Sequence, residues 1–108
     1  MLKKQIESCI KVIEDPYSKR ENNYQSIEEL ILNLYFNIKE NALIPEEVFE
    51  ARKSEILNCL KNWQTELNTN EKNIDYEDYK EKISKKVADI ELNILKYIGA
   101  VNFKNYHL

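Results

Sequence analysis

The chain has 108 residues and a net charge of −3, and it contains one glycine and two prolines. So little turn-forming chemistry, with no Asn-Gly or Pro-Gly pair, disfavours a sheet protein and favours long helices in a single domain over residues 1–108. The mildly acidic balance disfavours nonspecific binding to nucleic acid or anionic membranes, and no apolar run reaches the length of a membrane span.

Residues 2–14 form the first predicted helix, because their apolar side chains recur three and four positions apart and so share one face. Asp15 precedes Pro16, and a residue before proline is pushed out of the helical region, which ends the helix. Residues 16–25 are polar and aperiodic, and they predict a loop. The apolar face of the helix consists of Leu2, Ile6, Cys9, Ile10 and Ile13.

Residues 26–40 form the second predicted helix. Ser26 and Glu29 have the spacing of a capping box, in which each side chain accepts a hydrogen bond from the other residue's backbone amide. A broad apolar stripe follows, and Leu32 and Phe36 add apolar surface on another side, so we expect this helix to be central in the fold. The stripe consists of Ile27, Leu30, Ile31, Leu34, Tyr35 and Ile38.

Residues 45–67 form the third predicted helix. Pro45 suits its first position, and the acidic side chains of Glu46 and Glu47 meet the positive end of the helix dipole. Trp63 is expected in the core, because base-stacking aromatics are interleaved with basic residues and this chain is acidic. The apolar face consists of Phe49, Ile56, Cys59, Leu60, Trp63 and Leu67, and residues 68–73 predict a second polar loop.

The fourth predicted helix, residues 75–98, opens in the stretch NIDYEDYKEK, which places three carboxylates and two tyrosines between Asp75 and Tyr79. Asp75 has the position of an N-cap, and Ile74 with Tyr79 has the spacing of a hydrophobic staple. Glu77 and Asp78 favour the helix dipole. Two pairs four residues apart predict ion pairs: Asp78–Lys82 and Glu81–Lys85. Helix-start chemistry thus explains most of this stretch.

The rest of this helix carries two apolar seams. The regular one, spaced like a coiled coil, consists of Ile83, Val87, Ile90, Ile94, Tyr97 and Val101. The second and weaker one consists of Ala88, Leu92, Leu95 and Gly99. Gly99 is expected at or just past the helix end. Beyond it lies a short apolar tail with Val101, Phe103, Tyr106 and Leu108. Four helices with short connections predict an all-α, antiparallel four-helix bundle followed by this tail.

Catalytic chemistry is poorly represented in the sequence. The one histidine, His107, is next to last, so a Ser–His or Cys–His nucleophile would depend on a terminal residue. A single glycine excludes a glycine-rich phosphate loop, and no residue spacing fits a zinc, di-metal or calcium site. Cys9 and Cys59 are expected as buried free thiols, which favours a reducing cytoplasm. We therefore expect a cytoplasmic protein with neither enzymatic activity nor a cofactor.

Charge layout is the remaining functional signal. Between Glu21 and Ala51 there are seven acidic residues and one basic residue, Lys39. Acidic patches that carry tyrosines suit a basic protein partner, because tyrosine is enriched at interface hot spots and complementary charge speeds association. The alternative interpretation is a solvated face with no partner. The candidate partner-binding residues are Glu28, Glu29, Glu46, Glu47, Glu50, Asp75, Tyr76, Glu77 and Asp78. Glu46, Glu47 and Glu50 are the weaker members, because the third helix of an up-and-down bundle begins at the opposite end.

Two classes of function fit these features. The first is a non-catalytic, acidic binding module, such as a bacterial immunity protein or antitoxin that neutralises a basic toxin, for example a nuclease; a nuclease must be basic to hold its substrate. A phage anti-defence protein would share the same features. The second is an oligomeric helical scaffold or adaptor, because a helix that is apolar on two sides is either central in its own bundle or buried in a partner. The second seam of the fourth helix would then join copies of the chain.

Overall fold

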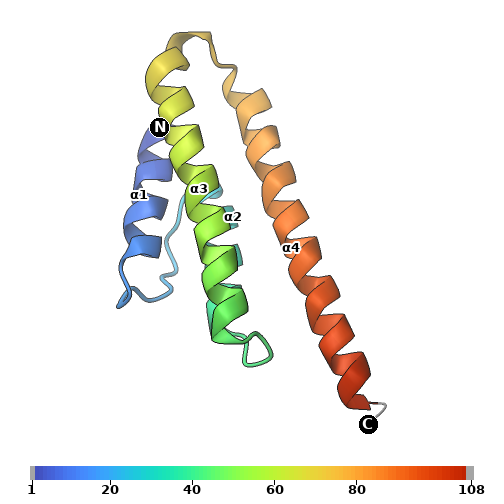
Figure 1. Cartoon of the computed structure of the whole chain (residues 1–108). Coiled ribbons are helices and arrows are strands. Elements are labelled where there is room, and N and C mark those ends of the chain that lie inside the picture. Colours follow the sequence, from blue (N-terminus) through green and yellow to red (C-terminus); the bar gives the residue numbers. More distant parts are fainter. Residues whose placement is uncertain (1, 107–108) are drawn as a thin grey trace.

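The computed structural model describes the backbone of residues 2–106 and the side chains of residues 2–70 and 72–99. Within that range the chain forms helices and no strand (Figure 1). The helices are α1 (Leu2–Glu14), α2 (Ser26–Glu40), α3 (Glu46–Asn70) and α4 (Tyr76–Tyr106), with a short 3-10 helix, η1 (Glu71–Asn73), between α3 and α4. The predicted all-α four-helix bundle is confirmed.

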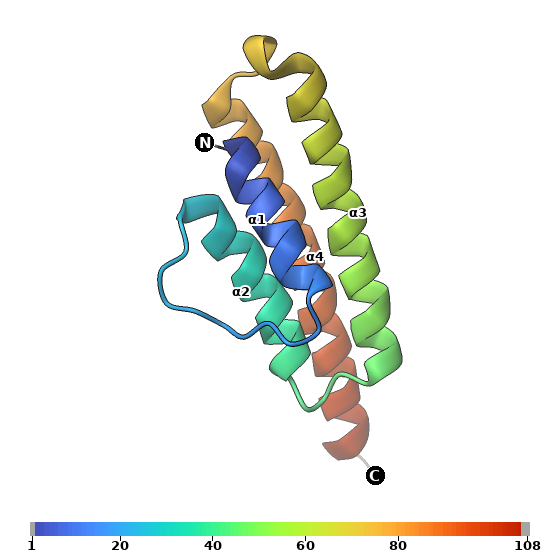
Figure 2. The same ribbon diagram turned by 90° about the vertical axis from the view of Figure 1, so that its left-hand side faces the viewer.

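The helices α2, α3 and α4 alternate in direction, but α1 does not follow this alternation (Figures 1 and 2). α3 runs antiparallel to α2 and α4, but α1 and α2 run in the same direction (Figures 1 and 2). The 13 residues of α1 span about 20 Å at 1.5 Å per residue. The connection of residues 15–25 can span up to about 36 Å when extended, so it is long enough to return along the whole of α1 before α2 begins.

The core lies between α1, α2 and α3 and continues along α4. α1 packs between α2 and α3, while α2 contacts all three other helices, which confirms its predicted central position. Tyr35 and Phe36 of α2 are almost fully buried, and their rings meet edge to face with centroids 5.1 Å apart. Trp63 is buried as predicted, at 7% exposure. α4 packs chiefly along α2 and lies at the edge of the bundle.

Two predicted helix ends are wrong. α3 continues to Asn70, so residues 68–70 are helical rather than part of a loop. No glycine or proline interrupts this segment, and the hydroxyls of Thr65 and Thr69 donate to the carbonyls four residues before them, which suits a continuing helix. α4 continues through Gly99 to Tyr106. One glycine costs a helix about 1 kcal/mol, too little to end one of 31 residues.

The predicted apolar tail after Gly99 is therefore helical as far as Tyr106, where α4 ends. The side chains of Val101, Phe103 and Tyr106, and all of His107 and Leu108, lie outside the described residues. Figure 1 shows the C-terminal end of α4 extending beyond the other helices. The molecule is accordingly elongated, with principal extents of 56 × 28 × 23 Å. None of the described helices combines the length and the apolar character that crossing a membrane requires.

Candidate functional site

The start of α4 is organised by Asp75. One carboxylate oxygen of Asp75, Oδ1, accepts hydrogen bonds from the backbone amides of Glu77, at 2.9 Å, and Asp78, at 3.1 Å. This geometry confirms Asp75 as the N-cap. Tyr76 is 40% exposed, and the ammonium of Lys80 lies 5.3 Å from the centroid of its ring. The carboxylates of Glu77 and Asp78 are exposed on the same first turn.

Tyr79 turns from this start toward α3. Its ring is buried, and its hydroxyl donates a hydrogen bond to the carboxylate of Glu66. Lys82 forms an ion pair with the same carboxylate at 3.2 Å, so the predicted pair between Asp78 and Lys82 is wrong. Tyr79 already holds the carboxylate of Glu66 in place beside Lys82, whereas no such contact positions the carboxylate of Asp78. The predicted Glu81–Lys85 pair is present at 3.4 Å.

This cluster shifts the pKa values of its members. Burial, followed by the hydrogen bond to Glu66, raises the pKa of Tyr79 above its ordinary value. The hydrogen bond from Tyr79 is the main cause that lowers the pKa of Glu66. Both shifts stabilise a neutral phenol against a charged carboxylate. Tyr79 is thus held as a hydrogen-bond donor that joins α3 to α4, and it is not activated as a nucleophile or base.

The start of α2 differs from its prediction. Gln25, not Ser26, is the N-cap residue, and its backbone amide donates to Glu28 rather than Ser26 pairing with Glu29. The first amides of the helix are satisfied from α1 instead: the side-chain oxygen of Gln5 accepts from the amides of Ile27, at 2.9 Å, and Glu28. Gln5 is the one buried polar residue among the described side chains. A polar residue within the apolar stripe of residues 2–14 was the signal for this role.

The carboxylate of Glu28 is engaged in hydrogen bonds within the fold. Besides the amide of Gln25, its carboxylate accepts a hydrogen bond from the hydroxyl of Ser8 at 2.8 Å. Glu28 is half-buried, whereas Glu29 beside it is exposed. Of the two predicted binding carboxylates on this turn, Glu28 joins α1 to α2, and Glu29 is turned toward solvent.

The remaining predicted acids open α3. Glu46, Glu47 and Glu50 are exposed, and they lie at the opposite end from the starts of α2 and α4 because α3 runs antiparallel to both (Figures 1 and 2). The nine predicted residues thus divide into two groups at opposite ends of the bundle. None of the eight carboxylates forms an ion pair with any described lysine or arginine; the acidic partners in the ion pairs are Glu14, Glu40, Glu55, Glu66 and Glu81.

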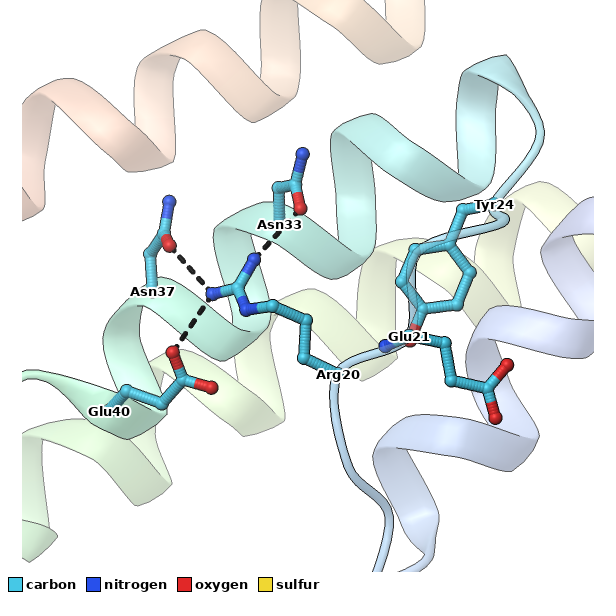
Figure 3. Close-up of polar contacts among 6 residues, drawn as sticks. All are labelled: Arg20, Glu21, Tyr24, Asn33, Asn37 and Glu40. Carbon is cyan, nitrogen blue, oxygen red and sulfur yellow. Dashed lines mark hydrogen bonds and ion pairs between the residues drawn. The ribbon is translucent and has the colours of Figure 1, made fainter.

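Arg20 forms a polar cluster that the sequence did not predict. Its guanidinium donates to the side-chain oxygens of Asn33, Asn37 and Glu40, at 2.9, 2.8 and 3.1 Å (Figure 3). Asn33, Asn37 and Glu40 follow the outer face of α2 at spacings of four and three, which was the available signal. The cluster attaches the connection between α1 and α2 to α2, and in the same connection the hydroxyl of Tyr24 accepts from the amide of Glu21.

The two thiols differ in their surroundings. Cys9 is fully buried as predicted, and burial is the main cause that raises its pKa to about 12. Cys59 is half-buried, and burial raises its pKa as well, although the nearby Lys86 opposes the shift. Both thiols therefore stay protonated near neutral pH. Within the described part of the chain, no group of three or more His, Cys, Asp and Glu side chains is arranged to hold a metal ion.

Comparison with known proteins adds no relative to this description. No protein-family model matches the chain, and no curated protein or solved structure matches it.

Proposed function

We propose that this chain is a non-catalytic binding module that holds a basic protein through the carboxylates at the start of α4. Glu77 and Asp78 are the principal contacts, with Tyr76 as the anchor. The observation that carries the proposal is that these carboxylates are exposed and form no ion pair with a described basic residue. They are therefore free to meet the cations of a partner.

The role of Tyr76 follows from its position between carboxylates. Its ring is large and 40% exposed, and the Lys80 ammonium already lies against it. A ring that accepts one cation can accept a lysine or arginine of a partner in the same manner. Loss of a buried aromatic anchor at an interface costs roughly 2 kcal/mol or more of binding energy. Glu29 lies in the first turn of α2, at the same end of the bundle as the start of α4 (Figures 1 and 2), and it is the next exposed carboxylate.

A toxin neutralised by an immunity protein or antitoxin is the partner class that suits this chemistry. A toxic nuclease carries a basic substrate channel, and an acidic surface that enters it blocks substrate by occupying the phosphate sites. Steering between such surfaces is screened over about 8 Å at physiological ionic strength. The association rate should therefore fall as salt rises, while the dissociation rate changes less.

A matched pair of charge reversals tests the proposal. Wild-type protein, Glu77→Lys/Asp78→Lys and Glu46→Lys/Glu47→Lys serve as baits for affinity capture in the native organism, and the captured protein is then measured by surface plasmon resonance across a salt series. The two variants change the charge equally, each at a helix start, but at opposite ends of the bundle. We expect a basic partner that the first variant loses and the second retains. A partner bound equally by both, or at a rate indifferent to salt, contradicts the proposal.

An oligomeric scaffold is the second candidate, and it has its own supporting observation. The second seam of α4 remains exposed: Leu92 is 51% and Leu95 57% exposed. This surface lies on a different part of the molecule from the acidic residues at the helix starts.

A further inference from the structure

The exposed seam of α4 consists of Ala88, Leu92, Leu95 and Gly99. All four residues are exposed, while Ile90 and Ile94 between them, and Val87 just before them, are buried. The seam therefore occupies the outward face of a helix whose other face packs on α2. Leu95 also lines a groove of about 300 Å³ between α2 and α4, which includes the half-exposed Leu30. Apolar surface thus continues from α4 onto α2.

The spacing of the seam is symmetric. Its steps are four, three and four residues, so Leu92 and Leu95 lie equally far from a point between Asn93 and Ile94, and so do Ala88 and Gly99. A two-fold axis through that point sets Leu92 against Leu95 of the partner subunit. It also sets Ala88 against Gly99 of the partner subunit. Such isologous contacts are the usual basis of homodimers, and this spacing is that of a coiled-coil seam.

Gly99 supports a contact of this kind. It lies inside α4, where glycine costs about 1 kcal/mol relative to alanine. A Cβ atom added at Gly99 would meet nothing within 4 Å, so packing within the described part of the chain does not require a glycine there. Close approach of a second helix does give glycine a role at this position, because only small side chains let two backbones come together.

The charges beside the seam are complementary in the same arrangement. In an antiparallel pair each flank of the seam meets the same flank of the other helix, which sets Asp89 beside Lys96 of the partner subunit twice. Both residues are exposed, and neither forms an ion pair with a described residue of its own chain. A parallel pair would instead give Lys96 the partner's Glu91, but it would align the two helix dipoles rather than oppose them.

We propose that two copies of this chain associate through α4, antiparallel, with Leu92 packed against Leu95 of the partner subunit and Asp89 paired with Lys96 of the partner subunit. This inference names the partner and the geometry for the scaffold candidate. It does not depend on the acidic surface at the start of α4.

Sedimentation velocity of the full chain over a concentration series tests the pairing. We expect a wild-type dimer. Lys96→Glu should weaken it about tenfold or more, and Asp89→Lys/Lys96→Glu should restore it. Gly99→Leu should give a monomer of unchanged helicity, because the added side chain meets open space in one chain but Ala88 of the partner subunit in the dimer. Leu92→Ala/Leu95→Ala, at exposed positions, should also be a folded monomer.

Two results overturn the proposal. A wild-type chain that stays monomeric at about 1 mM would show that the two copies do not associate with a useful affinity. Restoration by Glu91→Lys/Lys96→Glu in place of Asp89→Lys/Lys96→Glu overturns the antiparallel geometry. Glu77→Lys/Asp78→Lys, which tests the acidic surface, should leave the dimer unchanged, so failure of one proposal is distinguishable from failure of the other.

Discussion

The hydroxyl of Tyr79 in the first turn of α4 donates a hydrogen bond to the carboxylate of Glu66 near the end of α3. The two helices are antiparallel, and this contact joins them next to their connection. Tyr79→Phe keeps the ring in the core and removes only the donor. In urea melts at pH 7 we expect the free energy of unfolding to fall by about 1 kcal/mol. Tyr97 is half-buried, and its hydroxyl has no hydrogen bond to a described residue, so Tyr97→Phe is the control and should change the free energy of unfolding less.

The same contact predicts a pH dependence. The pKa of Glu66 is lowered from its ordinary 4.5, so its contribution to stability is complete above that value and is lost as pH falls through the folded-state pKa. The pKa of Tyr79 is raised from 10.0, so its contribution is complete below pH 10 and is lost as pH rises further. The stability difference between wild type and Tyr79→Phe should therefore be largest between these limits and shrink at pH 3. A difference constant from pH 3 to 7 would contradict the assignment.

The N-cap at Asp75 predicts a graded pair of substitutions. Asp75→Ala removes the acceptor of the Glu77 and Asp78 amides and should cost about 1 kcal/mol of stability, with the helical fold retained. Asp75→Asn keeps an equally good cap and should restore most of that loss. Urea melts followed by circular dichroism measure both variants, and an unchanged midpoint for Asp75→Ala would remove the cap assignment.

Substitution of Gln5, which lies in α1, should destabilise the start of α2. Gln5→Leu has similar bulk but leaves the amides of Ile27 and Glu28 without their acceptor, which should cost about 1–3 kcal/mol. Hydrogen exchange provides the specific measurement. The amides of residues 27 and 28 should exchange faster in the variant relative to the rest of α2. Uniform acceleration across the helix would instead indicate a general loss of packing.

The thiols predict a two-step labelling pattern. At pH 8 a thiol reagent should label the half-buried Cys59 while the folded protein leaves Cys9 unmodified, because burial both shields Cys9 and holds its pKa near 12. In urea the two thiols should react at similar rates. Cys59→Ser assigns the phases, since it should abolish labelling of the folded chain. Rapid labelling of Cys9 in the folded protein would contradict its burial.

The sequence predicted the features that depend on local periodicity and capping. The helices at residues 2–14 and 26–40 have the predicted bounds, and Asp75 caps α4 as expected. Features that depend on distant residues were missed. Gln5 caps a helix 22 residues later in the chain, and Arg20 reaches three side chains of α2. Local spacing marks Gln5 and the polar residues of α2 as unusual, but it does not name the distant residues that they contact. The end of α4 was predicted too early, at Gly99, because the stability of the whole helix, and not one residue, decides where it ends.

The candidate site follows the same division. Exposure of Glu77 and Asp78 could be expected from their place in an acidic first turn. The involvement of Glu28 with Ser8 could not, because it depends on α1 and α2 running in the same direction. The connection of residues 15–25 is long enough to permit that direction, but no periodic pattern in the sequence selects it over the antiparallel one. The predicted binding residues therefore divide into carboxylates that hold the fold and carboxylates that face solvent.

The connection of residues 15–25 has one more consequence. α1 lies between α2 and α3, and Arg20 fixes the middle of the connection to α2 by its three hydrogen bonds (Figure 3). A cut after Asn22 would leave Arg20 on the same piece as α1, with the buried face of α1 and the Arg20 cluster still available to hold the two pieces together. We therefore expect a fragment that ends at Asn22 and a fragment that begins at Asn23 to reassemble when they are supplied separately, with α1 and Arg20 as the contacts between them.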